Sequence, residues 1–247
     1  MRPVSVFIMD VSDSSSKGNG EALSSYLSKL ESMIKSWDGQ SGLVQVRHRA
    51  GDELIVLAEG YSTAFIIAFY ISRIWKYRRN TPYYGLSFGS TEKSIDTIDI
   101  EKWIHPLVKQ AREANDYLKK QKDRESFRFQ SFDIEPEFLV MMNGMLSLQH
   151  VLSTQQTDIQ RLVCSLYLIF GKQNAVADLL GRSAPTVYSH FKKGHSEQIL
   201  QSFREIVGVL DSLEAKTFPD IMLHQENDMK TTIENDIKGK VSEVFSL

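Results

Sequence analysis

Three acidic residues stand where expected strands end, and carboxylates in such places can bind a divalent cation. Asp10 follows an apolar run, and Asp52 and Glu53 lie in a short polar turn between two further runs. Carboxylate oxygens are the ligands that Mg²⁺ prefers in proteins. We therefore expect Asp10, Asp52 and Glu53 to hold Mg²⁺, with Asp13 as a further candidate ligand. Such a metal could grip nucleotide phosphates, and Arg112 could stabilise a developing negative charge.

The same acidic residues also have a structural interpretation. Gly-Asp-Glu is ordinary turn chemistry at a hairpin tip, and an aspartate after an apolar strand is an ordinary strand exit. The order of the residues along the chain favours metal or nucleotide binding, but it does not exclude the structural alternative. Both interpretations stay open at this point.

The stretch 173–193 has the residue pattern of a helix-turn-helix. Ala177 is small where two helices must approach closely, and Gly181 can adopt the left-handed conformation that the turn needs. Val187 can pack the second helix onto the first, and Ser183 is a good N-cap. The side chains that we expect to contact double-stranded DNA, from the turn and the second helix, are Arg182, Ser183, Thr186, Tyr188, Ser189, His190, Lys192 and Lys193.

Positive charge is concentrated around this stretch. Four basic residues outnumber the single acid Asp178 there, while the formal net charge of the whole chain is −2. Lysines and arginines that flank a recognition helix suit contacts with DNA phosphates. The structural alternative is a helical hairpin that packs only against its own protein, because such short motifs often match by chance. The four basic residues are Lys172, Arg182, Lys192 and Lys193.

The hydrophobic pattern predicts the elements that carry these residues. Short apolar or alternating runs indicate strands, and a period of 3.6 residues indicates helices. The first half has the order strand, helix, strand, strand, helix, strand and then a further helix, which is the order of a ferredoxin-like α+β fold. The expected strands are Val4–Met9, Val44–Arg49, Glu53–Ala58 and Tyr83–Phe88, and the expected helices are Glu21–Ser36, Ser62–Tyr77 and Ile104–Gln121.

The second half is predicted to be helical. The charged stretch Lys119–Arg128 suggests a boundary, and Phe127–Phe132 is either one more strand or a linker. We expect a ferredoxin-like domain over 1–132, an all-α helix-turn-helix domain over 133–215 and a weakly helical tail over 216–247 that a partner chain could order. The other helices expected here are Glu135–Leu152, Asp158–Phe170 and Glu197–Ala215.

Four segments of the first half occur in the order of the SatD family, and we take the chain to resemble that family. They are Phe7–Asp10, Arg49–Leu54, Tyr84–Gly89 and His105–Ala114. The SatD family is itself similar to class III nucleotide cyclases and GGDEF enzymes. The resemblance implies that Asp10 matches the first metal aspartate of these enzymes, that Gly51–Glu53 matches their hairpin and that Arg112 matches the arginine of an Ala-Arg pair. The stretch 173–193 resembles the helix-turn-helix of resolvase-type and sigma-type regulators.

The chain also departs from the cyclase pattern. Ala50 replaces the first glycine of the GGDEF hairpin, His105 stands where a glycine is expected, and Lys109 stands where cyclases often have a ribose-orienting asparagine. These replacements leave metal ligands in place and favour a domain that senses a ligand or supports assembly.

Composition limits the class of protein. The chain of 247 residues is 42% apolar and has one cysteine, so a disulfide framework and a cysteine-rich zinc site are excluded. Cys164 lies in an apolar run and is expected to be buried. The first residues lack a signal-peptide pattern, and the most apolar stretch, Ala64–Ile74, is too short to span a membrane. We expect a cytoplasmic protein with no membrane association.

The sequence supports three functions. The first is a DNA-binding protein, a transcriptional regulator with a degenerate cyclase-like sensory or assembly domain, that works as a homodimer formed by Glu197–Ala215 and the tail. The second is a Mg²⁺-dependent nucleotidyl cyclase or nucleotidyltransferase, with Arg112 as its catalytic residue and a nucleotide as its ligand. The third is a non-catalytic protein-interaction module.

Overall fold

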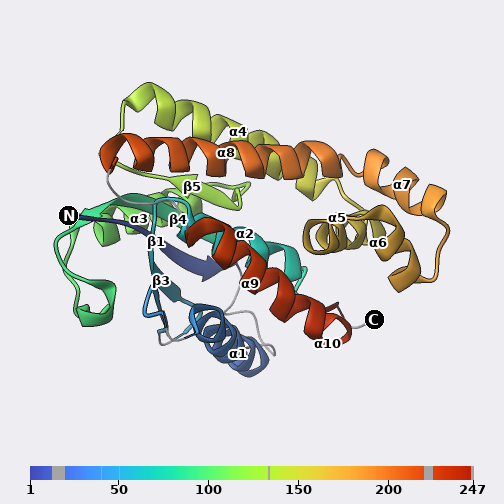
Figure 1. Ribbon diagram of the computed structural model, residues 1–247, viewed down its shortest axis with the longest axis horizontal. Coiled ribbons are helices and arrows are strands. Elements are labelled where there is room, and N and C mark those ends of the chain that lie inside the picture. The colour runs from blue at the N-terminus through green and yellow to red at the C-terminus, as the bar shows by residue number, and fades with distance from the viewer. Residues whose placement is uncertain (13–19, 40, 50, 133, 220–224, 246–247) are drawn as a thin grey trace.

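A five-stranded sheet forms the centre of the molecule (Figure 1), a computed structural model described over residues 1–12, 20–39, 41–49, 51–132, 134–219 and 225–245. Its strand order is β2-β3-β1-β4-β5. β1 runs antiparallel to β3 and β4, β2 runs antiparallel to β3, and β5 runs parallel to β4. Sheet and helices together confirm the mixed α+β class. The strands are β1 (Arg2–Val11), β2 (Val44–His48), β3 (Leu54–Glu59), β4 (Pro82–Thr91) and β5 (Phe127–Phe129).

Both faces of the sheet are buried, so successive residues of β1 enter two different cores. Phe7 and Met9 pack with α1 (Gly20–Asp38) and α2 (Thr63–Ile74). Val6 and Ile8 pack in a second core with the helix α3 (Pro106–Lys120) and the short turn η1 (Ile95–Thr97). A strand that is covered on both sides must be apolar throughout, as Val4–Met9 is.

Gly85 lets α3 lie directly against β4. A Cβ atom at this position would stand 2.1 Å from the carbonyl oxygen of Ala111 and 2.3 Å from the backbone nitrogen of Asn115. The Asn115 side chain also donates a hydrogen bond to the Ile8 carbonyl at 3.0 Å. The absence of a side chain at Gly85 therefore fixes the distance between α3 and the end of β1, where Asp10 lies.

Only helices follow β5 in the described residues, and the longest of the first five shares the core of the sheet. The stacked rings of Phe203 and Phe69 lie 4.1 Å apart, which joins the fifth of these helices to α2. One hydrophobic cluster thus contains residues from both sides of position 132. In Figure 1 the first and fifth of the five run side by side along one edge of the molecule. The five are α4 (Pro136–Thr154), α5 (Asp158–Phe170), α6 (Gln173–Leu180), α7 (Ala184–Lys193) and α8 (Ser196–Thr217).

The C-terminal segment packs on its own chain. In α9 (Gln225–Gly239) the side chains of Ile233 and Ile237 are fully buried. Tyr70 of α2 donates a hydrogen bond to Glu234 at 2.8 Å, and Trp37 of α1 donates one to Asp236 at 3.0 Å. The first half of the chain therefore contacts this helix directly. A short helix, α10 (Val241–Phe245), follows.

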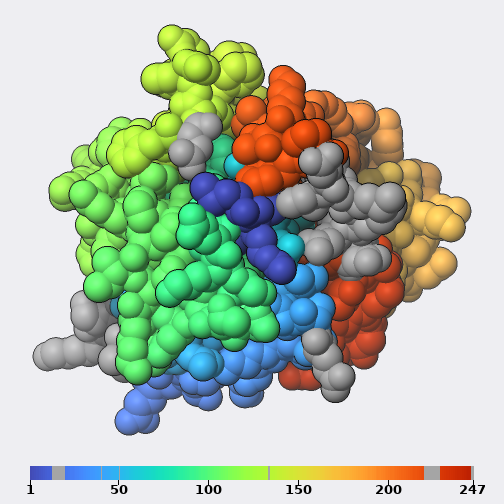
Figure 2. All heavy atoms as spheres, turned by 60° about the vertical axis from the view of Figure 1, so that its left-hand side comes forward, coloured from blue at the N-terminus to red at the C-terminus, as the bar shows by residue number. Residues whose placement is uncertain are grey.

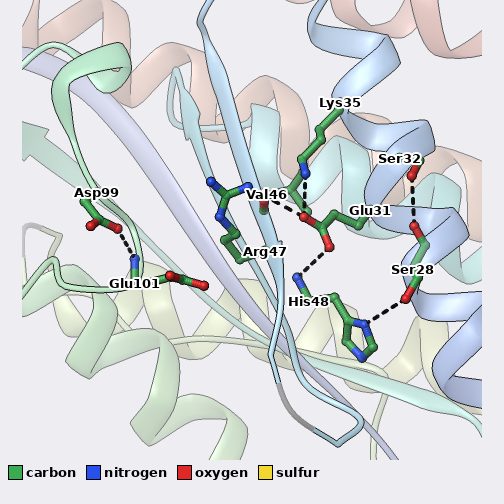
Figure 3. A network of polar contacts seen from close by, with 9 residues as sticks. All are labelled: Ser28, Glu31, Ser32, Lys35, Val46, Arg47, His48, Asp99 and Glu101. Atoms are coloured by element: carbon green, nitrogen blue, oxygen red, sulfur yellow. Dashed lines mark hydrogen bonds and ion pairs between the residues drawn. The ribbon is translucent and has the colours of Figure 1, made fainter.

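A polar network ties α1 to β2 (Figure 3). Glu31 accepts hydrogen bonds from the Lys35 ammonium at 2.6 Å and from the His48 backbone N–H at 3.2 Å, and Arg47 lies 3.7 Å away. Burial acts to raise the pKa of Glu31, but the hydrogen bonds from Lys35 and His48 keep it below its usual range. Within the described ranges, no helix is both long and apolar enough to cross a bilayer.

Candidate functional site

A left-handed glycine joins α6 to α7. Gly181 has a φ of 58°, and the Arg182 N–H donates to the Ala177 carbonyl at 3.0 Å. This is the hydrogen-bond pattern in which a C-terminal glycine closes a helix. Ser183 then caps α7, because its Oγ accepts the Thr186 N–H at 3.4 Å. The predicted turn and the predicted N-cap are both present.

α6 and α7 share a small core with α5. Val176 and Val187 are fully buried, and Ala177 is 4% exposed. They pack against Val163 and Leu166 of α5, which are also fully buried. The contribution of α5 could have been found from the spacing of its apolar residues, since positions three apart share one face of a helix.

The eight residues that we expected to contact DNA lie on α7 and the turn before it. Tyr188 is 49% exposed, so its side chain is accessible to a partner. Three others are half-buried at the side of the helix and keep part of their surface in solvent. The exposed residues are Arg182, Ser183, Tyr188, Lys192 and Lys193, and the half-buried ones are Thr186, Ser189 and His190.

The basic residues around α7 differ in their partners. Lys192 forms an ion pair with Glu197 of α8 and lies 5.8 Å from the centre of the Tyr188 ring. By contrast, Lys172, Arg182 and Lys193 form no ion pair with any residue in the described part of the chain. Among the described residues, these three cations therefore lack an ion-pair partner and can bind an external anion.

The orientation of α7 is fixed at its C-terminal end. A Cβ atom at Gly194 would lie 2.7 Å from Cβ of Gln160, so only a glycine lets the chain pass from α7 to α8 so close to α5. The Tyr167 and Phe191 rings are 4.4 Å apart and pack α7 onto α5 from the other side. These contacts with α5 hold the outward face of α7 in one orientation.

Asp10 lies at the far end of the molecule's central strand, buried among other acids. It is 8% exposed and stands opposite Tyr83 in the pairing of β1 with β4. Burial, and then the charges of Asp52 and Glu53, raise the pKa of Asp10 from 3.8 to about 6. The three predicted metal ligands are therefore close enough to repel one another.

Glu53 is held by two arginines. Nη1 and Nη2 of Arg112 lie 2.6 and 2.9 Å from its two carboxylate oxygens, and Nη1 of Arg49 lies 3.0 Å from one of them. Burial acts to raise the pKa of Glu53, but the hydrogen bonds and charge of Arg112, then of Arg49, hold it below its usual range. Arg112 thus contacts a carboxylate, and Glu53 has no oxygen without a partner.

Asp13 and Ala50 lie outside the described residues. Among the residues that are described, no three His, Cys, Asp or Glu side chains are arranged to hold a metal ion. Of the three predicted ligands, this leaves Asp10 and Asp52. The charge of Arg112 offsets only part of the effects that raise the pKa of Asp10.

Sequence reasoning missed several charged neighbours of Asp10. Asp116 and Lys119 follow Arg112 on α3; Lys119 with Arg112 offsets part of the burial effect on Asp10, and Asp116 acts on Arg112 and Tyr83 beside it. The spacing of four and then three residues places all three on one face of a helix, and that spacing was visible in the sequence. Tyr83 could not have been found in this way, because only the strand register places it beside Asp10.

The chain was compared with protein-family models, with curated proteins and with solved structures, and none of these comparisons finds a match.

Proposed function

We propose that the chain is a DNA-binding protein, a transcriptional regulator in which α5, α6 and α7 form a helix-turn-helix unit and α7 enters the major groove. The observation that carries the proposal is the outward face of α7, where Tyr188 is exposed and Arg182 and Lys193 have no ion-pair partner among the described residues. Polar side chains near the start of a helix can reach base edges, and unpaired cations beside it can bind phosphates.

The first half supports a ferredoxin-like, cyclase-like domain. The strand order β2-β3-β1-β4 with antiparallel neighbours is the arrangement that such a fold requires, and β5 extends it by one strand. We propose on this ground that the SatD resemblance reflects a common fold. The domain then serves as a sensory or assembly platform for α7.

A binding measurement with duplex DNA tests the proposal. A labelled random-sequence duplex should bind at low salt, and the double variant Arg182→Gln/Lys193→Gln should bind roughly tenfold or more weakly, since each lost phosphate contact weakens affinity. The control is Lys93→Gln/Lys216→Gln, which removes the same charge from exposed positions away from α7. Failure of the unmodified protein to bind at low salt, or equal weakening in the control, would refute DNA binding.

We also propose that two copies of the chain bind DNA together, because two half-sites multiply the few base contacts of one helix. The apolar residues of α8 that we expected to form a dimer are buried within the chain, including Phe203 and Leu210. α4 instead exposes apolar side chains, with Met141 67% and Leu148 68% exposed, and Figure 2 shows this yellow-green helix standing out from the body of the molecule.

A face without charges can pair with itself across a two-fold axis, as a symmetric dimer requires. Leu148→Glu should therefore halve the mass measured by light scattering at a concentration where the unmodified chain is a dimer. Gln155→Glu adds the same charge at the exposed end of α4 and should leave the mass unchanged. A monomeric mass for the unmodified chain would count against the homodimer.

A second candidate function is metal-dependent nucleotide binding. The observation that favours it is Asp10, a buried carboxylate whose pKa is raised by burial and by Asp52 and Glu53, and which a cation would relieve. We propose that Asp10 and Asp52 would hold Mg²⁺, which would supply positive charge for nucleotide phosphates. The chain itself would contribute the Arg112 guanidinium. To bind a phosphate, Arg112 would first have to release the Glu53 carboxylate.

Thermal unfolding tests this candidate separately from DNA binding. Mg²⁺ with GTP or ATP should raise the midpoint of the unmodified chain and leave Asp10→Asn unaffected. Release of pyrophosphate would indicate turnover as a cyclase or nucleotidyltransferase. No shift with either metal or nucleotide would remove the candidate.

A further inference from the structure

Arginines converge where α2, α4 and α5 meet, and two of them, Arg73 and Arg161, form no ion pair with a described residue. A hollow of about 630 Å³ lies there, a size typical of small-molecule sites. Arg73 lines an adjoining hollow that shares Arg78 and Arg161 with the first. The polar lining of the larger hollow includes one carboxylate, Asp123, together with Arg78, Arg124, Arg161, Ser126, His150 and Thr154.

Arg73 is the buried member of this arginine cluster, and Arg161 is half-buried. Arg73 is 4% exposed, donates to the Gln156 side-chain oxygen at 3.0 Å, and has an Nε without a hydrogen-bond partner among the described atoms. Arg161 donates one hydrogen bond, from Nη2 to the Ser72 carbonyl at 2.5 Å. Each guanidinium has five N–H donors, so both keep donors that the described chain does not use.

The positive charge of the cluster is balanced only in part, by Asp158 beside Arg78 and by Asp123 in the lining. Neither Arg73 nor Arg161 forms an ion pair with a described residue, and Arg78 pairs with Asp158, whose side chain is 86% exposed. Burial, and then the charges of Arg73 and Arg78, lower the pKa of Arg161 to about 10. Three like charges at a partly buried site cost free energy unless an anion joins them.

Helix capping explains only part of this arrangement. The Ser72 carbonyl is in the last turn of α2, where a cation is favoured by the helix dipole. One arginine is enough for that interaction, and it uses one N–H. The remaining donors of Arg161, and those of Arg73, have no such explanation.

His150 adds a further donor to the hollow. Its Nδ1 accepts the Ser126 backbone N–H at 3.2 Å, so the neutral ring carries its proton on Nε2. Burial lowers the pKa of His150, which keeps the ring neutral near pH 7. A nearby anion would reverse this effect and raise that pKa.

We infer that this hollow binds the phosphate group of a small molecule, with Arg161 and Arg78 as its principal ligands and His150 at its edge. The planar fork of arginine matches the geometry of phosphate oxygens, and donors in a partly buried site bind an oxyanion more strongly than exposed lysines do. The volume of the hollow leaves room for more than inorganic phosphate. The inference does not depend on DNA binding, because its residues lie outside α6 and α7.

Binding of pyrophosphate and of inorganic phosphate to the full chain tests the inference. Calorimetry at low ionic strength should show saturable binding, and NMR of the imidazole signals should show the pKa of His150 rising as pyrophosphate is added. Arg78→Gln and Arg161→Lys should each weaken binding about tenfold, or about 1.4 kcal/mol. Arg161→Lys keeps the charge and removes the fork, and Arg78→Gln changes a half-exposed side chain, so both variants should fold.

The matched control is Arg204→Gln, which removes one arginine charge from the exposed side of α8. It should bind pyrophosphate as the unmodified chain does. Absence of binding up to about 10 mM, or an equal loss in Arg204→Gln, would overturn the inference, since affinity weaker than the millimolar range is no better than general ion screening. Binding without a change at His150 would place the anion elsewhere and would equally overturn it.

Discussion

Charged residues cluster both at the acidic end of the sheet and around α6 and α7, but the two clusters differ in burial and in ion pairing. At the acidic end, Glu53 is held by Arg112 and Arg49, and Asp10 is 8% exposed. Around α7, Arg182 and Lys193 are exposed and form no ion pair among the described residues. Charges that are paired within the chain stabilise or strain the fold, whereas exposed charges without an ion-pair partner remain available to bind another molecule. Because of this contrast, we propose DNA binding by α7 as the main function and nucleotide binding at the acidic end as the second candidate.

The largest effect is expected from Gly85→Ala. The new Cβ would overlap the Ala111 carbonyl and the Asn115 nitrogen, so α3 must move away from β4, and the free energy of unfolding should fall by about 3 kcal/mol or more. Gly144→Ala is the control, because nothing lies within 4 Å of the new atom on α4 and alanine favours a helix. Urea unfolding of both variants makes the comparison; a Gly85→Ala variant as stable as the unmodified chain would contradict the close packing at the acidic end.

The next largest effect is expected from Asp10→Asn and depends on pH. Because the pKa of Asp10 is raised from 3.8 to about 6, the folded chain holds a proton there that the unfolded chain releases, and stability is lost as pH rises through this window. Asparagine should therefore increase the free energy of unfolding by up to about 3 kcal/mol above pH 7, and by almost nothing near pH 4. Urea unfolding at both pH values measures the difference. An equal effect at the two pH values would show that the raised pKa of Asp10, which burial and then the charges of Asp52 and Glu53 cause, is not the reason for the change in stability.

A smaller effect is expected from Arg112→Gln. Glu53 would keep Arg49 but lose its two-point contact with α3, and Arg112 is partly exposed, so we expect a loss of about 1–2 kcal/mol in the free energy of unfolding. Arg47→Gln breaks a looser pair at 3.7 Å with Glu31 and should cost less than about 1 kcal/mol. If the two variants were equally stable, the acidic end would be no more tightly paired than the surface network of Figure 3.

Local patterns predicted most of the elements but not their packing. The helix over Asp158–Phe170 was predicted to the residue, and the strand Val4–Met9 was found within two residues at each end. The helix expected over Ser62–Tyr77 ends instead at Ile74, since Trp75 turns to an extended conformation and its ring N–H donates to the Asn80 carbonyl. The hydrophobic pattern that predicts a helix gives no sign of this contact.

The two sites differ in how much of them the sequence could reveal. The turn at Gly181 and the cap at Ser183 depend on residues a few positions apart, so their types and spacing were sufficient. The pairing of Arg112 with Glu53 joins residues 59 positions apart and follows from how α3 lies on the sheet. For the same reason the sequence did not reveal the cluster of Arg73 and Arg161, because the burial of Arg73 and the contact of Arg161 with the Ser72 carbonyl depend on the packing of α2 against α5.

The salt dependence of duplex binding tests the central proposal most directly. If Arg182 and Lys193 bind phosphates, the slope of log affinity against log salt should fall by about two for Arg182→Gln/Lys193→Gln, and it should be unchanged for Lys93→Gln/Lys216→Gln. Equal slopes for the unmodified chain and the Arg182→Gln/Lys193→Gln variant would contradict the proposal that the free cations around α7 exist to hold DNA.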